Sequence, residues 1–299
     1  MTTSVAVPAS DSRNFVPGVH LLQIRDWIYK TAGVFQPDHE LAWLETRCML
    51  RMKELQIGLM RDYLHYLTLQ EGDPSESALL LDRIVDGETY FFRGQPQFDA
   101  LHKIILPRIL AAKSKFPGRT LKIWSAGCSS GEEGYSLAIT LLEASSILKD
   151  WVCSIRATDL NEDSVARAKR GIYAESSTRN LTSTIRQKYF LKDGDSLSVC
   201  AQARALVEIQ RLNLLDDRRM ASMANFDVIF CRNVLIHFDM ASRSRIVEHF
   251  HRSLSPDGFL FLGHAESLFG VTKNFSLVHM PSATAYEKNR TQPAKRLLP

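Results

Sequence analysis

Apolar side chains in the first part of the chain recur at helical spacing and are separated by polar turns. Three amphipathic stretches show this period: residues 21–28, 41–55 and 60–69. Pro37 and the turn at 72–74 interrupt the pattern. Because residues three or four apart share one face of a helix, each stretch can bury one face against the others. We therefore expect an all-α domain over residues 15–85, after a flexible polar N-terminus over residues 1–14.

The period changes in the second part of the chain, where short apolar runs alternate with helical segments. The predicted strands are four apolar runs: residues 121–124, 152–158, 226–230 and 259–262. A helix over 242–254 leads to a Pro-Asp-Gly turn at 256–258, which we expect before the fourth strand. Residues 275–280 and 283–288 predict a final strand pair. Strands that alternate with helices are typical of a parallel sheet, so the sequence predicts an α/β domain over residues 86–288.

This rhythm breaks after the helix that follows the second strand. Residues 182–189 predict a helix, two short strands flank the Asp-Gly-Asp turn at 193–195, and an apolar segment over 205–210 returns the chain. The interruption predicts a small antiparallel β subdomain inserted at residues 172–212. Residues 289–299 are basic and contain proline, which favours a flexible tail.

The run from Leu121 to Tyr135 carries the clearest sign of a ligand site. It has the pattern of a buried strand, a turn of small residues from Ser125 to Gly131, and the start of a helix. Small residues let a ligand approach the backbone closely. Ligands of open parallel sheets bind at the carboxyl ends of the strands, so we expect a cofactor at this turn.

Acidic residues around the turn indicate which kind of ligand it binds. Gly127 and Gly131 precede Glu132 and Glu133, whereas a pyrophosphate loop follows G-x-G-x-x-G and avoids negative charge. Glu132 alone is equally well explained as a partner of the helix dipole. Asp159 at the end of the next strand favours a ligand, because an acid there typically accepts hydrogen bonds from a ribose. A ligand with a ribose, a cationic end and no phosphate is indicated, and S-adenosylmethionine fits this description.

Composition argues against several other classes of protein. The chain has 299 residues and a net charge of +4, but its basic residues are spread out, which disfavours a nucleic-acid partner. Its five cysteines form no C-x-x-C pair and its nine histidines no ligand pattern, so we expect neither a metal nor disulfides. No apolar run approaches the ~20 residues that span a bilayer, and the N-terminus lacks a signal-peptide pattern. We expect a cytoplasmic protein.

Motifs along the chain resemble, in family order, those of the CheR-type chemotaxis receptor methyltransferases. Besides the turn described above, they occupy residues 88–93, 157–160, 213–215, 230–238 and 262–268. The resemblance extends over about residues 15 to 285. It implies a Rossmann-like S-adenosylmethionine-dependent methyltransferase domain, an all-α N-terminal domain, and methyl transfer to specific chemoreceptor glutamates with release of S-adenosylhomocysteine.

The resemblance also implies the partners. We expect a monomer that binds the cytoplasmic helices of methyl-accepting chemoreceptors, without membrane insertion. In some relatives the β subdomain binds a receptor C-terminal peptide by strand addition. The sequence leaves open whether this chain does so.

Site residues follow from the resemblance motif by motif. The positions that match cofactor contacts are Thr89, Arg93, Ala126, Glu132, Asp159, Asn213, Leu214, Arg232 and Asn233. Arg93 and His237 are the expected catalytic residues, Arg93 because a guanidinium can steer the acceptor carboxylate and His237 as an orienting group. The family's N-terminal helices present basic residues to the acidic receptor helices, and the basic residues on the second helix here are Arg47, Arg51 and Lys53. Taken singly, each position also has an ordinary explanation, such as a helix cap, a turn, an ion pair or a solvated face.

Two positions depart from the family pattern. The usual Asn before Glu88 and Thr89 is Gly87, which removes a side-chain hydrogen bond worth ~1 kcal/mol near the cofactor. His237 stands where an aromatic hydroxyl is usual, which puts in question any mechanism that relies on a phenol. A glutamate is already ionised at neutral pH, so we expect in-line transfer by alignment, without a general base. Three alternatives stay open: a scaffold without turnover, an RNA methyltransferase, and a family member that serves an array unrelated to swimming.

Overall fold

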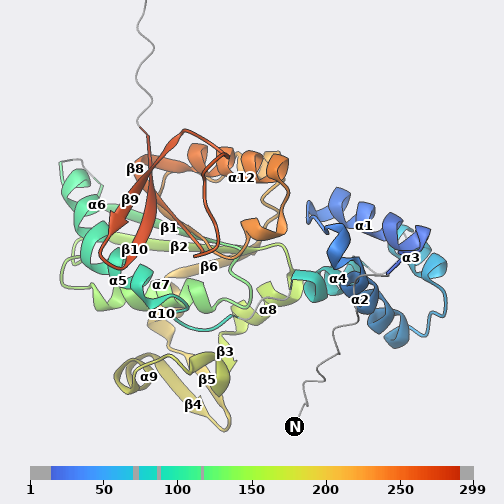
Figure 1. The fold of residues 1–299 in the computed structure, drawn as a ribbon. Helices are drawn as coiled ribbons and strands as arrows, with labels where there is room; N and C mark the ends of the chain where they lie inside the picture. Colours follow the sequence, from blue (N-terminus) through green and yellow to red (C-terminus); the bar gives the residue numbers. More distant parts are fainter. Residues whose placement is uncertain (1–14, 70–73, 86–88, 116–117, 290–299) are drawn as a thin grey trace, which may run out of the picture. The chain divides into compact units, whose positions relative to one another are not determined.

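The computed structural model describes residues 15–69, 74–85, 89–115 and 118–289. It separates the chain into two compact units, Met1–Asp86 and Gly87–Pro299 (Figure 1). Gly87, the predicted flexible segment 1–14 and residues 290–299 of the predicted tail lie outside the described residues, so those predictions stay open. Among the described residues, no helix combines the length and the apolar character that a membrane span requires.

The first unit consists of helices, as the apolar periodicity predicted. They are α1 (Val19–Ala32), the short 3-10 helix η2 (Asp38–Glu40), α2 (Leu41–Glu54), α3 (Met60–Thr68) and α4 (Pro74–Val85). The periodicity did not single out α4. Ile24 and Ile28 of α1, Leu44 and Cys48 of α2, and Tyr63 of α3 are fully buried. Burial of such apolar side chains stabilises the unit by about 1.5–3 kcal/mol each.

A seven-stranded sheet forms the centre of the second unit, with the strand order β6-β2-β1-β7-β8-β10-β9. Its strands are β1 (Thr120–Ala126), β2 (Val152–Asp159), β6 (Val207–Arg211), β7 (Phe226–Cys231), β8 (Leu254–Leu262), β9 (Phe275–Met280) and β10 (Ala283–Lys288). The five strands from β6 to β8 are parallel, whereas β10 is antiparallel to β8 and β9. The predicted α/β class is confirmed. Because the chain winds outward in both directions from β1, the carboxyl ends of β1, β2 and β7 meet at one edge.

Helices cover both faces of this sheet. They are α5 (Gln95–Ala100), the π-helical η3 (Leu101–Ile105), α6 (Leu106–Lys113), α7 (Glu132–Glu143), α8 (Glu162–Arg170), α10 (Ala201–Ala205), α11 (Asp217–Met220) and α12 (Met240–Ser253). Successive residues of β1 enter two separate cores: Ile123 shares one with Leu137 of α7, and Trp124 shares the other with Phe250 of α12. Figure 1 shows α7 and α12 on opposite sides of the sheet. The strand ends that carry the candidate site are therefore held from both faces.

The predicted start of the fourth strand is wrong. The sequence predicts a turn at 256–258 before the strand, but β8 begins at Leu254 and runs through these residues. Asp257 has a φ of 63°, and the pairing of β7 with β8 shifts register between Phe226 and Val228. The predicted turn residues thus lie within β8, where they form an irregularity in its pairing with β7.

A three-stranded antiparallel sheet confirms the predicted β subdomain. Its order is β3 (Ile172–Ala174), β5 (Ser196–Val199) and β4 (Phe190–Asp193), and η4 (Glu175–Thr178) and α9 (Ser183–Tyr189) accompany it. The expected return segment lies elsewhere, because β6 pairs with β2 in the main sheet. Val207 and Ile209 of β6 pack against the core that contains Ile155. The predicted subdomain boundary at residue 212 is therefore too late.

Candidate functional site

Two glycines shape the loop that follows β1. Gly127 and Gly131 have φ angles of 79° and 98°, in the left-handed region that favours glycine. A Cβ atom on Gly127 would lie 2.3 Å from Val234 Cγ2, and one on Gly131 would lie 2.8 Å from Ala168 Cβ. The sequence suggested these glycines as room for a ligand. The structure shows that backbone conformation and close packing against neighbouring segments already require them.

Asp159 ends β2 beside this loop. Its Oδ2 accepts a hydrogen bond from the Ser129 N–H at 2.7 Å, and its Oδ1 accepts one from the Asn161 N–H at 3.0 Å. These bonds orient the carboxylate between two loops. An ionised carboxylate accepts hydrogen bonds through both oxygens, which is the chemistry that a ribose hydroxyl requires of its partner.

The two acids at the start of α7 have different partners. Glu132, at 2% exposure, accepts hydrogen bonds from Ser130 Oγ at 2.7 Å and Ser177 Oγ at 3.2 Å. Glu133 accepts one from Ser125 Oγ at 2.7 Å and contacts Arg232 Nη1 at 3.3 Å. Burial raises the pKa of both carboxyls, and Arg232 opposes this rise at Glu133. Glu132 thus holds two serine hydroxyls of the loop and η4, while Glu133 anchors the arginine that follows β7.

Arg232 is buried where β7 ends. Its side chain is enclosed: Arg232 Cζ lies 5.6 Å from the centre of the Phe98 ring, and a Cβ on Gly94 would lie 2.4 Å from its Nη2. Its Nε is buried and has no hydrogen-bond partner among the residues that the structure describes. A buried donor of this kind is costly unless something outside the chain satisfies it, which suits a residue that binds a ligand.

The segment before α5 reaches the same edge of the sheet. The Phe92 N–H donates to Ser136 Oγ of α7 at 2.9 Å, and the Phe91 N–H donates to the Ser177 carbonyl at 3.0 Å. Thr89 and Arg93 are half-buried. Arg93 precedes Gly94, which packs against the Arg232 side chain, so the backbone of Arg93 lies near the end of β7.

The predicted cofactor contacts Asn213 and Leu214 follow β6. The Asn213 Oδ1 accepts a hydrogen bond from the Leu215 N–H at 2.9 Å, which makes Asn213 a turn residue. The Leu212 N–H donates to the Asp159 carbonyl at 2.8 Å, so this segment adjoins the end of β2. Leu214 is buried, and Ala126 of β1 is fully buried in the same core. The Ala126 side chain therefore faces the core, and only its main chain is placed to contact a ligand.

The loop after β7 carries the last predicted positions. Asn233 has a φ of 58°, and His237 is half-buried at the end of the short 3-10 helix η5 (Leu235–His237). The ends of β1, β2, β6 and β7 thus bring the predicted residues of the second unit to one edge. Within the part of the chain that the structure describes, no group of His, Cys, Asp or Glu side chains is arranged to hold a metal ion.

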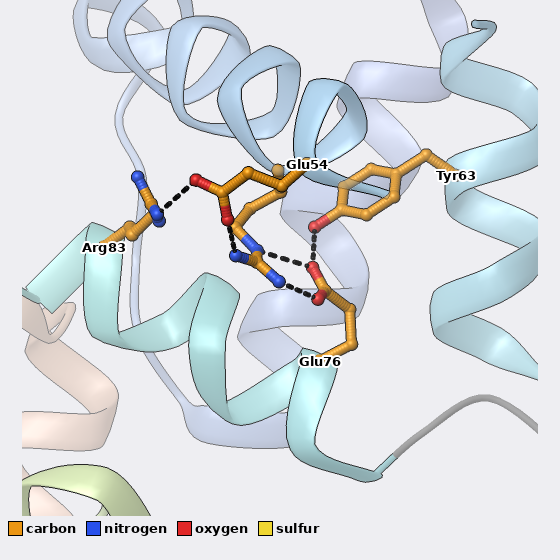
Figure 2. Close-up of polar contacts among 5 residues, drawn as sticks. Glu54, Tyr63, Glu76 and Arg83 are labelled. Atoms are coloured by element: carbon orange, nitrogen blue, oxygen red, sulfur yellow. Dashed lines mark hydrogen bonds and ion pairs between the residues drawn. The ribbon is translucent and has the colours of Figure 1, made fainter. Parts of the chain in front are cut away.

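The basic face predicted on α2 is corrected at Arg51. Arg51 is 6% exposed, its Nε donates to Glu76 Oε1 at 3.0 Å, and further contacts join it to Glu76 and Glu54. The Tyr63 hydroxyl donates to Glu76 Oε1 at 2.7 Å, and Arg83 Nη2 donates to Glu54 Oε1 at 2.6 Å (Figure 2). Arg51 is withdrawn from the surface because the buried carboxylate of Glu76 requires a cation.

The other two basic residues of α2 remain accessible. Arg47 is half-buried, with Cζ 4.7 Å from the centre of the Trp43 ring, and Lys53 is exposed. The basic surface predicted on α2 therefore consists of Arg47 and Lys53. Nothing in the sequence pattern distinguishes Arg51 from Arg47, since both lie at suitable positions on the helix.

A family model described as "CheR methyltransferase, SAM binding domain" matches residues 87–284. The chain is 33% identical over 267 residues to "Chemotaxis protein methyltransferase 2" of Vibrio cholerae, which covers 89% of this chain and 91% of that protein. It is also 33% identical over 265 residues to "Chemotaxis protein methyltransferase" of Borreliella burgdorferi, covering 88% and 91%. "Probable biofilm formation methyltransferase WspC" of Pseudomonas aeruginosa is 32% identical over 234 residues, which make up 78% of this chain and 54% of that protein.

Proposed function

Because this chain belongs to the CheR methyltransferase family, we propose that it methylates the side-chain carboxylates of specific glutamates in chemoreceptors. The domain over residues 87–284 uses S-adenosylmethionine, in agreement with the cofactor that the acids around the β1 loop indicated. The products are a glutamate methyl ester and S-adenosylhomocysteine. The relatives from Vibrio cholerae and Borreliella burgdorferi, named for chemotaxis, support a receptor as the substrate.

The observation that carries the proposal is the placement of Asp159 and Arg232 at the carboxyl ends of β2 and β7, the two parallel strands that flank β1. Asp159 is oriented by two backbone N–H groups, which suits hydrogen bonds to a ribose. At the same edge the buried Nε of Arg232 has no hydrogen-bond partner in the described part of the chain, and Glu132 and Glu133 make the segment between the two strand ends acidic. We assign the cofactor to these residues together with Thr89, Arg93, Ala126, Asn213, Leu214 and Asn233.

The chemistry asks the protein for alignment. Bound S-adenosylmethionine supplies a methyl group on a sulfonium, which is a strong leaving group. The acceptor glutamate has an ordinary pKa of ~4.3, so at neutral pH it needs no proton removed. Arg93 steers this carboxylate into line with a forked guanidinium, and His237 orients a reactant without taking a proton. Arg47 and Lys53 bind the acidic receptor helix through charge complementarity.

The test is a methylation assay with labelled S-adenosylmethionine and a purified receptor cytoplasmic fragment. Label that is released as methanol by mild base identifies a carboxyl methyl ester. Total RNA and a receptor fragment with the acceptor glutamates changed to alanine serve as controls. Label on RNA, or cofactor binding without any transfer to receptors, would favour an RNA methyltransferase or a scaffold instead.

A second candidate substrate is a receptor from an array that does not control swimming. The relative from Pseudomonas aeruginosa, named for biofilm formation, supports this alternative. Both candidates share one chemistry, so the assay compares receptor fragments from the two kinds of array. Preferential methylation of one fragment decides between them.

A further inference from the structure

Glu266, in the loop that follows β8, holds the loop that follows β7. Its Oε2 accepts hydrogen bonds from the N–H groups of Gly263 at 2.7 Å and Asn233 at 2.8 Å. Its Oε1 accepts from the N–H groups of Val234 at 2.9 Å and Ile236 at 3.3 Å. One carboxylate thus fixes three backbone positions of the segment that runs from Arg232 to His237.

Only an ionised carboxylate meets these four donors without a conflict. It accepts through both oxygens and donates nothing, whereas a glutamine amide would turn an NH2 group toward two of the N–H donors. The surrounding backbone is also tightly fitted. A Cβ on Gly263 would lie 2.7 Å from Glu266 Oε2 and 2.9 Å from the Asn233 nitrogen. Asn233 itself has a left-handed φ of 58°, a conformation that needs support from its surroundings.

We propose that Glu266 is a positioning residue for methyl transfer, which acts by fixing the loop that carries Arg232, Asn233 and His237. The inference rests on the proposed function, because it takes these three residues as the part of the site nearest the reacting groups. Glu266 contacts the backbone of that loop, so it acts on the reaction through its neighbours. A displacement of about 1 Å at a reacting centre can lower a rate by about 100-fold.

Asp227 provides a control at the start of β7, the end of that strand opposite the loop that Glu266 holds. It is 2% exposed and likewise bridges β7 to β8, accepting from Ser255 Oγ at 2.9 Å. It also accepts from the Lys122 N–H at 3.0 Å and from Lys113 Nζ at 2.9 Å. Both acids therefore connect the β7 and β8 segments, Asp227 as a buried residue and Glu266 as a half-buried one, but only Glu266 lies at the carboxyl ends where the site is.

The experiment compares Glu266→Gln and Asp227→Asn with the wild-type protein below their melting temperatures. For Glu266→Gln we expect S-adenosylhomocysteine to bind at least about tenfold more weakly and kcat for receptor methylation to fall about 10- to 100-fold. For Asp227→Asn we expect a lower melting temperature with both constants within about threefold of wild type. Equal effects of the two substitutions on kcat and affinity, or no effect of Glu266→Gln, would overturn the proposal.

Gly263→Ala keeps the result decisive if Glu266→Gln does not fold. The added methyl group displaces the carboxylate or the Asn233 backbone without removing a charge, so we expect the same loss of affinity and kcat. Wild-type activity of this variant would count against the inference. The affinity measurement needs no receptor, so a wild-type protein that binds S-adenosylhomocysteine but methylates no receptor refutes the proposed function separately.

Discussion

Asp159→Ala is the most direct test of where the cofactor binds. In the proposed site each hydrogen bond from a ribose hydroxyl to this carboxylate contributes roughly 1.5–3 kcal/mol, because the acceptor is charged. Loss of two such bonds amounts to at least about 3 kcal/mol, or roughly a 150-fold rise in the dissociation constant. The same substitution removes the acceptor for the Ser129 and Asn161 N–H groups, which loosens the loop and adds to the loss.

The assay is calorimetric titration of S-adenosylhomocysteine into both proteins, with thermal unfolding measured in parallel. Thr182→Ala is a suitable control, because it removes a side-chain acceptor from the Ile185 N–H at 3.2 Å in the helix that accompanies the small sheet. We expect Thr182→Ala to lower stability slightly and to leave the affinity unchanged. If folded Asp159→Ala protein binds S-adenosylhomocysteine with an affinity within about threefold of wild type, the ribose does not bind at the end of β2.

Three further predictions concern other parts of the chain. Replacing Arg47 and Lys53 together by Glu should reduce receptor methylation, most strongly at low salt, and leave S-adenosylhomocysteine binding unchanged in a titration; normal methylation would show that these residues are only solvated surface. His237→Gln should keep kcat within about tenfold of wild type between pH 6 and 9, and the wild-type rate should show no limb near the ordinary imidazole pKa of about 6.5. A wild-type limb that vanishes in the variant, together with a collapse in its rate, would make His237 a general base. Burial lowers the pKa of His249, so the native state binds fewer protons than the unfolded state and stability falls as pH drops below about 6.5; His249→Gln should flatten the fall in melting temperature between pH 7.5 and 5.5, and parallel curves would contradict this.

Sequence patterns predicted those elements whose signals are local. The final pair, β9 and β10, starts and ends at the predicted residues, because each strand alternates and a short turn separates them. The start of β8 was missed because its Pro-Asp-Gly signal is a local turn preference that pairing with β7 overrides. Likewise, β6 was expected beside the small sheet, since nothing local tells a strand which sheet it joins.

The candidate site divides in the same way. Resemblance to a family located the strand-end residues, but partners distant in sequence set their environments. Arg51 was assigned to a surface because its partner Glu76 lies on a helix that the periodicity did not reveal. Glu133 and Glu266 both lie inside the motifs that carry the resemblance, but neither was predicted as a site residue. Two adjacent acids at 132 and 133 point in different directions from a helix and therefore indicate two separate partners. Arg232 is the partner of Glu133.

The contact between Gly127 and Val234 has a consequence for how these loops vary among relatives. The space where a Cβ of residue 127 would stand is filled by a methyl group from the loop on the neighbouring strand. A residue larger than glycine at 127 therefore requires a smaller residue at 234 as well as a tolerated backbone conformation, so we expect the two positions to change together. Replacing the loop after β1 by that of a relative should give a folded protein only when the loop after β7 is replaced together with it.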